Sequence, residues 1–271
     1  MVETETENAA AKAPAARPPD RRASWRESVE SLLVTIVLAL FATCFVVQAF
    51  KIPSESMEPT LKVGDHLLVN KFIFEANGAW YDRFLPYRPI RRGDVIVFKF
   101  PFQNHPHYVK RVIGVPGDRI KIVNSVVYRD GQALREPYAH HDPSSYDPFA
   151  ENFPPANDEF LDAEVLPQWR KELPQYVNAQ DELVVPPGEY FVMGDNRDHS
   201  WDSRYWGFVP RDAIMGRPVI IYWSLKEPAE ASLDEETGES GPSRNWLLSL
   251  LDTLIHLPVD TRWGRMFKEV H

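Results

Sequence analysis

The chain contains a single cysteine, Cys44, so no intramolecular disulfide can hold its fold together. No stretch is strongly basic, and the net charge of −9 over 271 residues argues against nucleic acid as a partner. Helical periodicity is scarce between residues 51 and 225, which argues against a helical domain there. The composition, 44% hydrophobic and 25% charged, suits one globular domain with attachments.

One apolar run is long enough to span a membrane. Residues Leu32–Phe50 are interrupted only by Thr35, Thr43 and Gln48. A helix of that length, rising about 1.5 Å per residue, spans a hydrocarbon core of roughly 30 Å. We therefore predict a single transmembrane anchor helix over 25–50, preceded by a disordered tail over 1–24. A cleavable signal peptide is the alternative, but the run and its leader are both long for one.

The charges that flank this run predict its orientation. Lys51 and Lys62 follow it, whereas its N-terminal flank carries Arg17, Arg21, Arg22 and Arg26. The positive-inside rule then places the N-terminal tail in the cytoplasm and everything after Lys51 outside it.

Short strand-like runs, separated by Gly, Pro and Asp, dominate the chain after Lys51. The pair Asp130-Gly131, which follows one of these runs, is a hairpin signal. The pattern predicts a mostly antiparallel β domain built from residues 51–130 and 180–225. Its expected strands include His66–Asn70, Val95–Phe100, Arg119–Val123, Ser125–Arg129, Glu189–Met193 and Val219–Trp223.

The C-terminal part, residues 226–271, has a different character. Lys226–Ser243 is acidic and is expected to be a loop. Trp246–Ile255 is predicted to form a short apolar helix, too short to span a membrane, which packs on its own domain or docks on a membrane surface or partner. The closing segment Arg262–Phe267 is expected to return to the core.

Two separated segments carry side chains suited to acyl transfer. Ile52–Leu61 places Ser56 in a turn with two prolines, directly after the apolar run. A serine hydroxyl is a poor nucleophile until a base takes its proton. Tyr108–Asp118 carries Lys110 in an apolar strand-like run. Burial there would lower the lysine pKa from its usual value of about 10.4, whereas a lysine at the surface would stay protonated.

A third segment, Gly194–Pro210, completes the set. In their order and their position behind an anchor, the three segments resemble the bacterial type I signal peptidases, which use a serine and a lysine to cut exported preproteins. The resemblance implies that Ser56 is the nucleophile and Lys110 the general base. It implies that Ser54 adds a hydroxyl to the oxyanion hole and that Ser200 holds the neutral amine toward the nucleophile. A variable inserted domain would occupy residues 131–179.

Opposite charges crowd the second and third segments. We interpret them as structural ion pairs that fix the loop carrying Ser200, in preference to a catalytic carboxylate; the residues are Arg111, Asp195, Asp202 and Arg204. The family's specificity for small side chains before the cut implies shallow apolar pockets, and Met57 is a candidate to line one.

No cofactor and no metal are expected. His105–His107 and His140–Asp142 lack a convincing set of further ligands, so both are interpreted as loop residues. His199 neighbours Ser200, which makes it the alternative base if Lys110 is not the one.

The sequence thus predicts a membrane-bound Ser/Lys endopeptidase that removes signal peptides from exported preproteins. The five residues between Phe50 and Ser56 reach at most roughly 22 Å, which places the site near the bilayer. Expected partners are signal peptides, the lipid bilayer and the protein-export machinery, in the bacterial cytoplasmic (inner) membrane with the catalytic domain outside. A Ser/Lys protein that cuts other targets, itself included, and a catalytically inactive anchored homologue are the open alternatives.

Overall fold

The computed structural model describes residues 21–41, 47–74, 87–100, 107–145, 147–155, 164–226 and 259–271. The chain divides into two compact units, Met1–Thr43 and Cys44–His271. Three predicted features lie outside the described residues: the first twenty residues of the tail, the acidic segment after Lys226, and the helix Trp246–Ile255.

Helix α1 (Arg21–Phe41) belongs to the N-terminal unit. It carries the first half of the apolar run, and Leu32, Leu33, Val37 and Leu38 are each more than half exposed. Within the described part of the chain, no helix combines the length and the apolar character needed to cross a membrane.

The prediction of one helix over 25–50 is wrong at its C-terminal end. Residues Val47–Lys51 form strand β1, which pairs antiparallel with β2 (Asp65–Asn70) so that Phe50 lies opposite Leu67. The Phe50 ring also makes an edge contact with the ring of His107, at 4.9 Å between centroids. The end of the apolar run therefore serves a half-buried strand, and composition alone does not show where a helix gives way to a strand.

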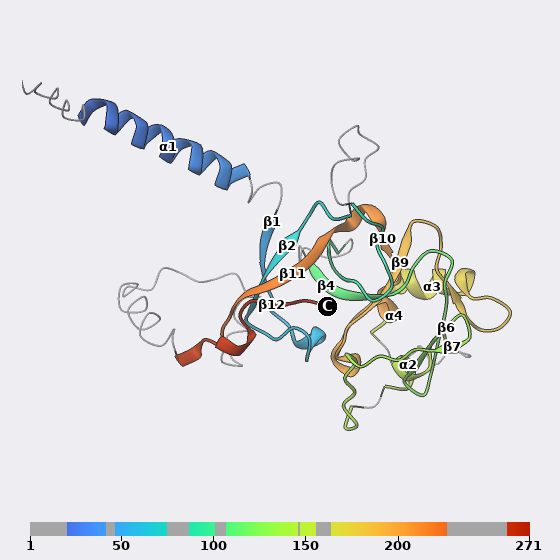
Figure 1. The fold of residues 1–271 in the computed structure, drawn as a ribbon. Coiled ribbons are helices and arrows are strands. Elements are labelled where there is room, and N and C mark those ends of the chain that lie inside the picture. The colour runs from blue at the N-terminus through green and yellow to red at the C-terminus, as the bar shows by residue number, and fades with distance from the viewer. Residues whose placement is uncertain are drawn as a thin grey trace, which may run out of the picture. The chain divides into compact units, whose positions relative to one another are not determined.

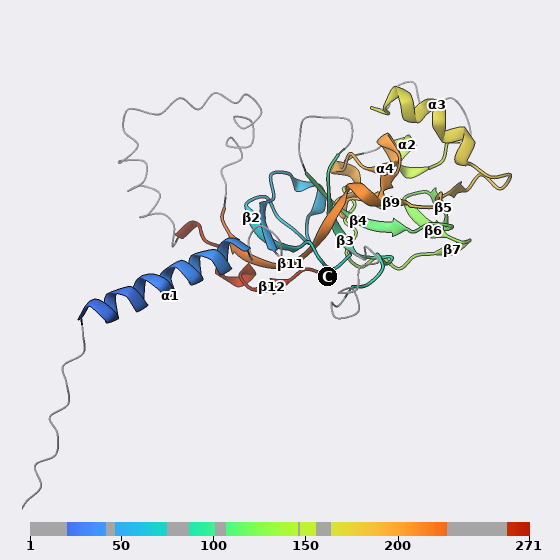
Figure 2. The same cartoon turned by 90° about the horizontal axis from the view of Figure 1, so that it is seen from above.

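The larger sheet has eight strands, all paired antiparallel (Figures 1 and 2). Their order is β1-β2-β11-β3-β4-β9-β10, and β12 pairs with β11. The predicted mostly antiparallel β architecture is confirmed. The remaining strands of this sheet are β3 (Val95–Phe98), β4 (Tyr108–Gly114), β9 (Glu189–Met193), β10 (Val209–Pro210), β11 (Ile214–Ser224) and β12 (Lys268–Glu269).

A second sheet of four antiparallel strands has the order β7-β6-β5-β8 (Figure 2). Its strands are β5 (Arg119–Val123), β6 (Val126–Arg129), β7 (Gln132–Ala133) and β8 (Leu183–Val184). The Asp130-Gly131 turn joins β6 to β7 with positive φ at both residues, 52° and 76°, as a tight hairpin requires. This sheet begins at Arg119 in β5, twelve residues before residue 131, the expected start of the inserted domain.

Short helices connect and cover the strands. The α-helices are α2 (Pro148–Glu151), α3 (Pro167–Tyr176) and α4 (Ser203–Trp206), and the 3₁₀ turns are η2 (Glu55–Met57), η5 (Arg197–His199), η6 (Arg211–Ala213) and η7 (Trp263–Arg265). Ile113 of β4 and Met193 of β9 belong to the same buried cluster as Ile120 of the second sheet. The two sheets therefore share a hydrophobic core.

The middle of the larger sheet is buried on both faces. All four residues of β3 are buried, which explains why it reads as a continuous apolar run rather than an alternating one. The neighbouring strand β4 is buried from Lys110 to Gly114, and it carries two cations, Lys110 and Arg111, that are only 2% and 3% exposed. Buried charges require partners, and these lead to the candidate site.

Candidate active site

The structure brings Ser56 and Lys110 into contact. Ser56 lies in the turn η2, and Lys110 lies on β4 opposite Ile96 of β3. Their atoms Oγ and Nζ are 2.6 Å apart, although the residues are 54 positions apart in the chain. This is a short hydrogen bond between a hydroxyl and an amine, which is the geometry that proton transfer between them needs.

Burial changes the chemistry of Lys110. Loss of hydration lowers the pKa of its ammonium from 10.5 to about 8. The carboxylates of Asp202 and Asp195 act in the opposite direction, and the charge of Arg204 adds to the lowering. A substantial fraction of the amine is therefore neutral slightly above neutral pH, and only the neutral amine accepts a proton.

Ser54 lies beside the nucleophile candidate. Its hydroxyl oxygen is 3.3 Å from the Ser56 hydroxyl oxygen, and either group can donate. Ser54 is exposed, so its hydroxyl is free to turn toward a bound substrate. A role in the oxyanion hole remains a prediction.

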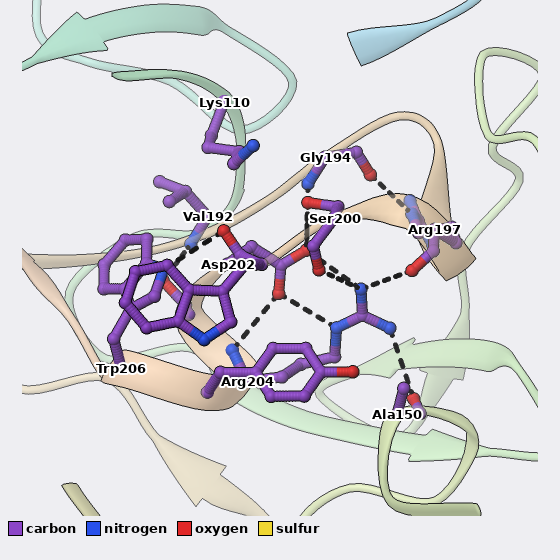
Figure 3. Close-up of polar contacts among 12 residues, drawn as sticks. Lys110, Ala150, Val192, Gly194, Arg197, Ser200, Asp202, Arg204 and Trp206 are labelled. Atoms are coloured by element: carbon purple, nitrogen blue, oxygen red, sulfur yellow. Dashed lines mark hydrogen bonds and ion pairs between the residues drawn. The ribbon is translucent and has the colours of Figure 1, made fainter. Parts of the chain in front are cut away.

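The Ser200 hydroxyl donates to the Asp202 carboxylate at 2.9 Å (Figure 3). A hydroxyl has one proton to donate, so while this bond is formed Ser200 has none left to donate to the Lys110 amine. The expected donation from Ser200 to a neutral lysine amine is therefore absent from this arrangement. Sequence reasoning missed the competing acceptor because Asp202 was assigned only to an ion pair.

Asp202 is the centre of the loop that carries Ser200. Its carboxylate accepts from Arg204 Nε and Nη2, both at 2.9 Å, and from the Gly194 amide at 3.0 Å (Figure 3). Burial acts to raise the pKa of Asp202, but the charge and hydrogen bonds of Arg204 outweigh it, so the net pKa is lowered. Asp202 therefore stays ionised and holds the ends of the loop together.

A second buried ion pair ties this loop to the nucleophile turn. Arg111 donates to both oxygens of Asp195, at 2.8 and 2.7 Å, and the Thr60 hydroxyl donates to the same carboxylate at 2.5 Å. Asn196 donates from its backbone to the Ser56 carbonyl at 3.1 Å. The four charged residues singled out in the sequence thus form two buried pairs, Arg111–Asp195 and Arg204–Asp202.

Gly194 occupies a position with no room for a side chain. A Cβ there would lie 2.5 Å from the Ser200 Cβ and still closer to the Ser200 hydroxyl and the Ser56 carbonyl oxygen. The glycine allows the loop to approach the nucleophile turn.

Replacing Gly194 with alanine is expected to lower kcat on the order of a hundredfold, because the added methyl group pushes Ser56 and Ser200 apart. Gly264→Ala is the matched control, since a Cβ there meets nothing within 4 Å. Steady-state cleavage of a peptide substrate measures both variants. Equal activity of Gly194→Ala and wild type would contradict the tight approach.

The other candidates from the sequence are engaged elsewhere. The ring nitrogens of His199 face carboxylates, Glu55 at 3.7 Å and Asp142 at 3.3 Å. Met57 is 1% exposed and packs with Ile52 and other core residues, so it can contribute only to the floor of a pocket. Among the described residues, no group of three or more His, Cys, Asp and Glu side chains is arranged to hold a metal ion.

Sequence reasoning missed Glu136 and Tyr138, which it assigned to the variable insertion. The Arg111 guanidinium lies 4.0 Å from the centre of the Tyr138 ring, and Glu136 accepts two hydrogen bonds from Arg197. Nothing in the local sequence signals these contacts, because they arise from how the chain returns from the second sheet.

Comparison with known proteins identifies the family. The profile of the family described as signal peptidase, peptidase S26, matches residues 25–223. Signal peptidase I of Pseudomonas aeruginosa is 34% identical over 217 residues, covering 75% of this chain and 74% of the relative. Signal peptidase I of Aquifex aeolicus is 35% identical over 234 residues, covering 75% and 86%. A crystal structure of a signal peptidase I from Enterococcus faecalis is 29% identical and covers 48% of this chain and 97% of that chain, with a TM-score of 0.33. The profile match and the two relatives show that the chain belongs to the signal peptidase family, peptidase S26, and that it is a serine endopeptidase.

Proposed function

We propose that this protein cleaves N-terminal signal peptides from exported preproteins with Ser56 as nucleophile and Lys110 as general base. The observation that carries the proposal is the 2.6 Å contact between the Ser56 hydroxyl and a buried lysine amine. The two named relatives are signal peptidases, which supports this class of substrate.

The neutral amine of Lys110 takes the proton of Ser56 as Oγ attacks the scissile carbonyl carbon. The oxyanion that forms is stabilised by the Ser56 backbone N–H and the Ser54 hydroxyl, 3.3 Å from the nucleophile. The Lys110 ammonium then gives its proton to the leaving amine as the peptide bond breaks. The amine, neutral again, takes a proton from the water that attacks the acyl-enzyme carbonyl carbon. The Lys110 ammonium then returns this proton to Ser56 Oγ as the ester bond breaks, and the product leaves as a carboxylic acid that ionises in water.

Ion pairs around the site act on this cycle indirectly. Asp202 and Asp195 favour the ammonium that forms in each step, whereas burial favours the neutral amine that starts it. The balance keeps the lysine pKa close to the pH at which both forms are accessible, which is the condition for efficient general-base catalysis.

The substrate's route suggests where the enzyme works. We propose a single-pass anchor that includes α1, with the N-terminus in the cytoplasm and the catalytic domain outside the bacterial cytoplasmic membrane. The exposed leucines and valines of α1 and the positive N-terminal flank support this topology. Signal peptides would then reach Ser56 beside the bilayer, next to the export machinery that delivers them. Residues 131–179 would form the family's variable inserted domain, and Met57 would contribute to the floor of the pocket for small side chains.

The proposal is tested by incubating a model preprotein with an Ala-x-Ala site in detergent with wild type, Ser56→Ala and Ser145→Ala. We expect cleavage at the predicted junction by wild type and Ser145→Ala, and none by Ser56→Ala. Ser145 is a matched control because it lies in a turn closed by a backbone hydrogen bond. Cleavage by Ser56→Ala would refute the nucleophile, and an inert wild type would favour a catalytically inactive homologue.

A further inference from the structure

The segment that follows β7 lies against the loop that carries Ser200. The His140 amide donates to the Asp195 carbonyl at 2.7 Å, and the Arg197 amide donates to the His140 carbonyl at 2.9 Å. The two segments therefore form a short parallel bridge, His140 with Asn196. After it leaves the second sheet, the chain supports the loop 194–202, the catalytic loop, before it continues to α2.

A buried ion pair strengthens this contact. Glu136 accepts from Arg197 Nη1 and Nη2 at 2.8 and 2.7 Å, and the two side chains are 8% and 2% exposed. The Tyr138 hydroxyl donates to the same carboxylate at 2.9 Å. A two-pronged, desolvated pair of this kind fixes the orientation of the guanidinium, which a single contact at the surface would not do.

Arg197 connects this pair to the catalytic loop. Its Nε donates to the Gly194 carbonyl at 3.1 Å, and its own carbonyl accepts from Arg204 Nη2 at 2.6 Å (Figure 3). Arg204 holds Asp202, which holds the Gly194 amide and the Ser200 hydroxyl. Loosening Arg197 would therefore release both sides of the turn beside Ser56.

The same segment supports the nucleophile turn by a second route. The Arg111 guanidinium lies over the Tyr138 ring, with its Cζ 4.0 Å from the centre of the ring. Arg111 binds Asp195, and Asp195 accepts the hydroxyl of Thr60, four residues after Ser56. Segment 136–140 thus contacts β4, which carries Lys110, and the loop around Asp195, which hydrogen-bonds to the nucleophile turn.

We infer that residues 136–140 are a positioning element of the catalytic centre and that Glu136 is a positioning residue that acts through Arg197. The inference rests on the proposed roles of Ser56 and Lys110. Glu136 is not among the charges that set the Lys110 pKa, so its effect reaches the reaction through geometry rather than through charge. A loss of geometry in the site lowers kcat, since misplacement by about 1 Å can cost about a hundredfold.

The test uses the full-length protein in detergent and compares Glu136→Gln with Glu182→Gln. Like Glu136, Glu182 pairs with an arginine, in this case Arg119 of the second sheet at 3.3 Å. Glu182→Gln therefore removes one paired carboxylate away from the catalytic loop. We expect Glu136→Gln to lower kcat ten- to a hundredfold and to change KM less than about threefold. The pH at which kcat falls on the acid side, set by Lys110, should be the same as in wild type. Glu182→Gln is expected to keep wild-type kcat. Unfolding midpoints, measured in parallel, ensure that kcat refers to folded enzyme.

A double variant tests the route. If Glu136 acts through Arg197, Glu136→Gln/Arg197→Met loses no more kcat than Arg197→Met alone. Multiplicative losses, or a wild-type kcat in folded Glu136→Gln, would overturn the inference. Ser56→Ala assayed alongside separates the two claims: if it is inactive while Glu136→Gln is fully active, only the positioning role fails, whereas an active Ser56→Ala refutes the proposed function.

Discussion

Replacing Lys110 with methionine is expected to lower kcat at least about a thousandfold. Among the residues that the structure describes, its amine is the one base within hydrogen-bond distance of the Ser56 hydroxyl. Methionine preserves the length and the apolar stem of the side chain, so the fold is kept. Single-turnover cleavage of a peptide measures the loss. Lys121→Met, on β5 of the second sheet, is the control and should retain full activity.

Wild-type activity should depend on pH through the same lysine. Because the neutral amine is the active form, kcat rises as pH increases and reaches a plateau above a pKa near 8. This rise, the acid limb of the pH profile, is followed by measuring kcat between pH 6 and 10, and it should disappear in Lys110→Met. A limb centred near 6.5 in wild type would instead implicate an ordinary histidine, with His199 the first candidate.

The lysine proposed as the general base also destabilises the fold. Its pKa is lower in the folded state than the unfolded value of 10.5, so between about pH 8 and 10.5 the unfolded chain binds more protons and stability rises with pH. Below pH 8 the full penalty, roughly 3 kcal/mol, is present. Lys110→Met should therefore be more stable than wild type at pH 7, and the difference should shrink toward pH 10.5. A variant less stable than wild type at pH 7 would contradict this account.

The antiparallel sheet followed from local signals in the sequence, whereas the contact between Ser56 and Lys110 was implied by the resemblance to a known family. Strand alternation and hairpin turns such as Asp130-Gly131 are local signals, and they predicted the antiparallel architecture. The resemblance of three segments to the type I signal peptidases implied that Ser56 and Lys110 act together, and their side chains do meet. The low pKa of Lys110 depends on its burial. That burial results from the pairing of β4 with β3, which the local sequence does not reveal.

Other features depend on competition that a sequence does not display. The apolar run continues past Phe41, the last residue of α1, yet Val47–Lys51 form a strand because they pair with β2. The Ser200 hydroxyl was expected to donate to Lys110, but its proton goes to the Asp202 carboxylate. Glu136 reaches Arg197 because the segment after β7 hydrogen-bonds to the loop that carries Ser200. In each case a tertiary partner decides between two locally acceptable arrangements.

Asp202→Asn is expected to lower the free energy of unfolding by about 3–5 kcal/mol. The asparagine leaves the buried Arg204 without a carboxylate, and its single carbonyl oxygen cannot serve Arg204, the Gly194 amide and the Ser200 hydroxyl together. Denaturant unfolding, followed by tryptophan fluorescence, measures the change. Asp130→Asn is the matched control: its partner Arg119 is at 3.4 Å, both are nearly half exposed, and a change within about 1 kcal/mol is expected.

The same variant separates the electrostatic role of Asp202 from its structural one. The Asp202 carboxylate raises the pKa of Lys110, whereas the Arg204 guanidinium lowers it. Removing the carboxylate leaves the guanidinium, so the pKa of Lys110 should fall. The acid limb of kcat should therefore move to lower pH in Asp202→Asn, even where the maximal kcat is reduced. A limb that moves to higher pH would mean that loosening of the loop admits water to Lys110 and outweighs the lost charge. Because burial is the largest influence on this lysine, the direction of that shift reports whether the loop still seals it from solvent.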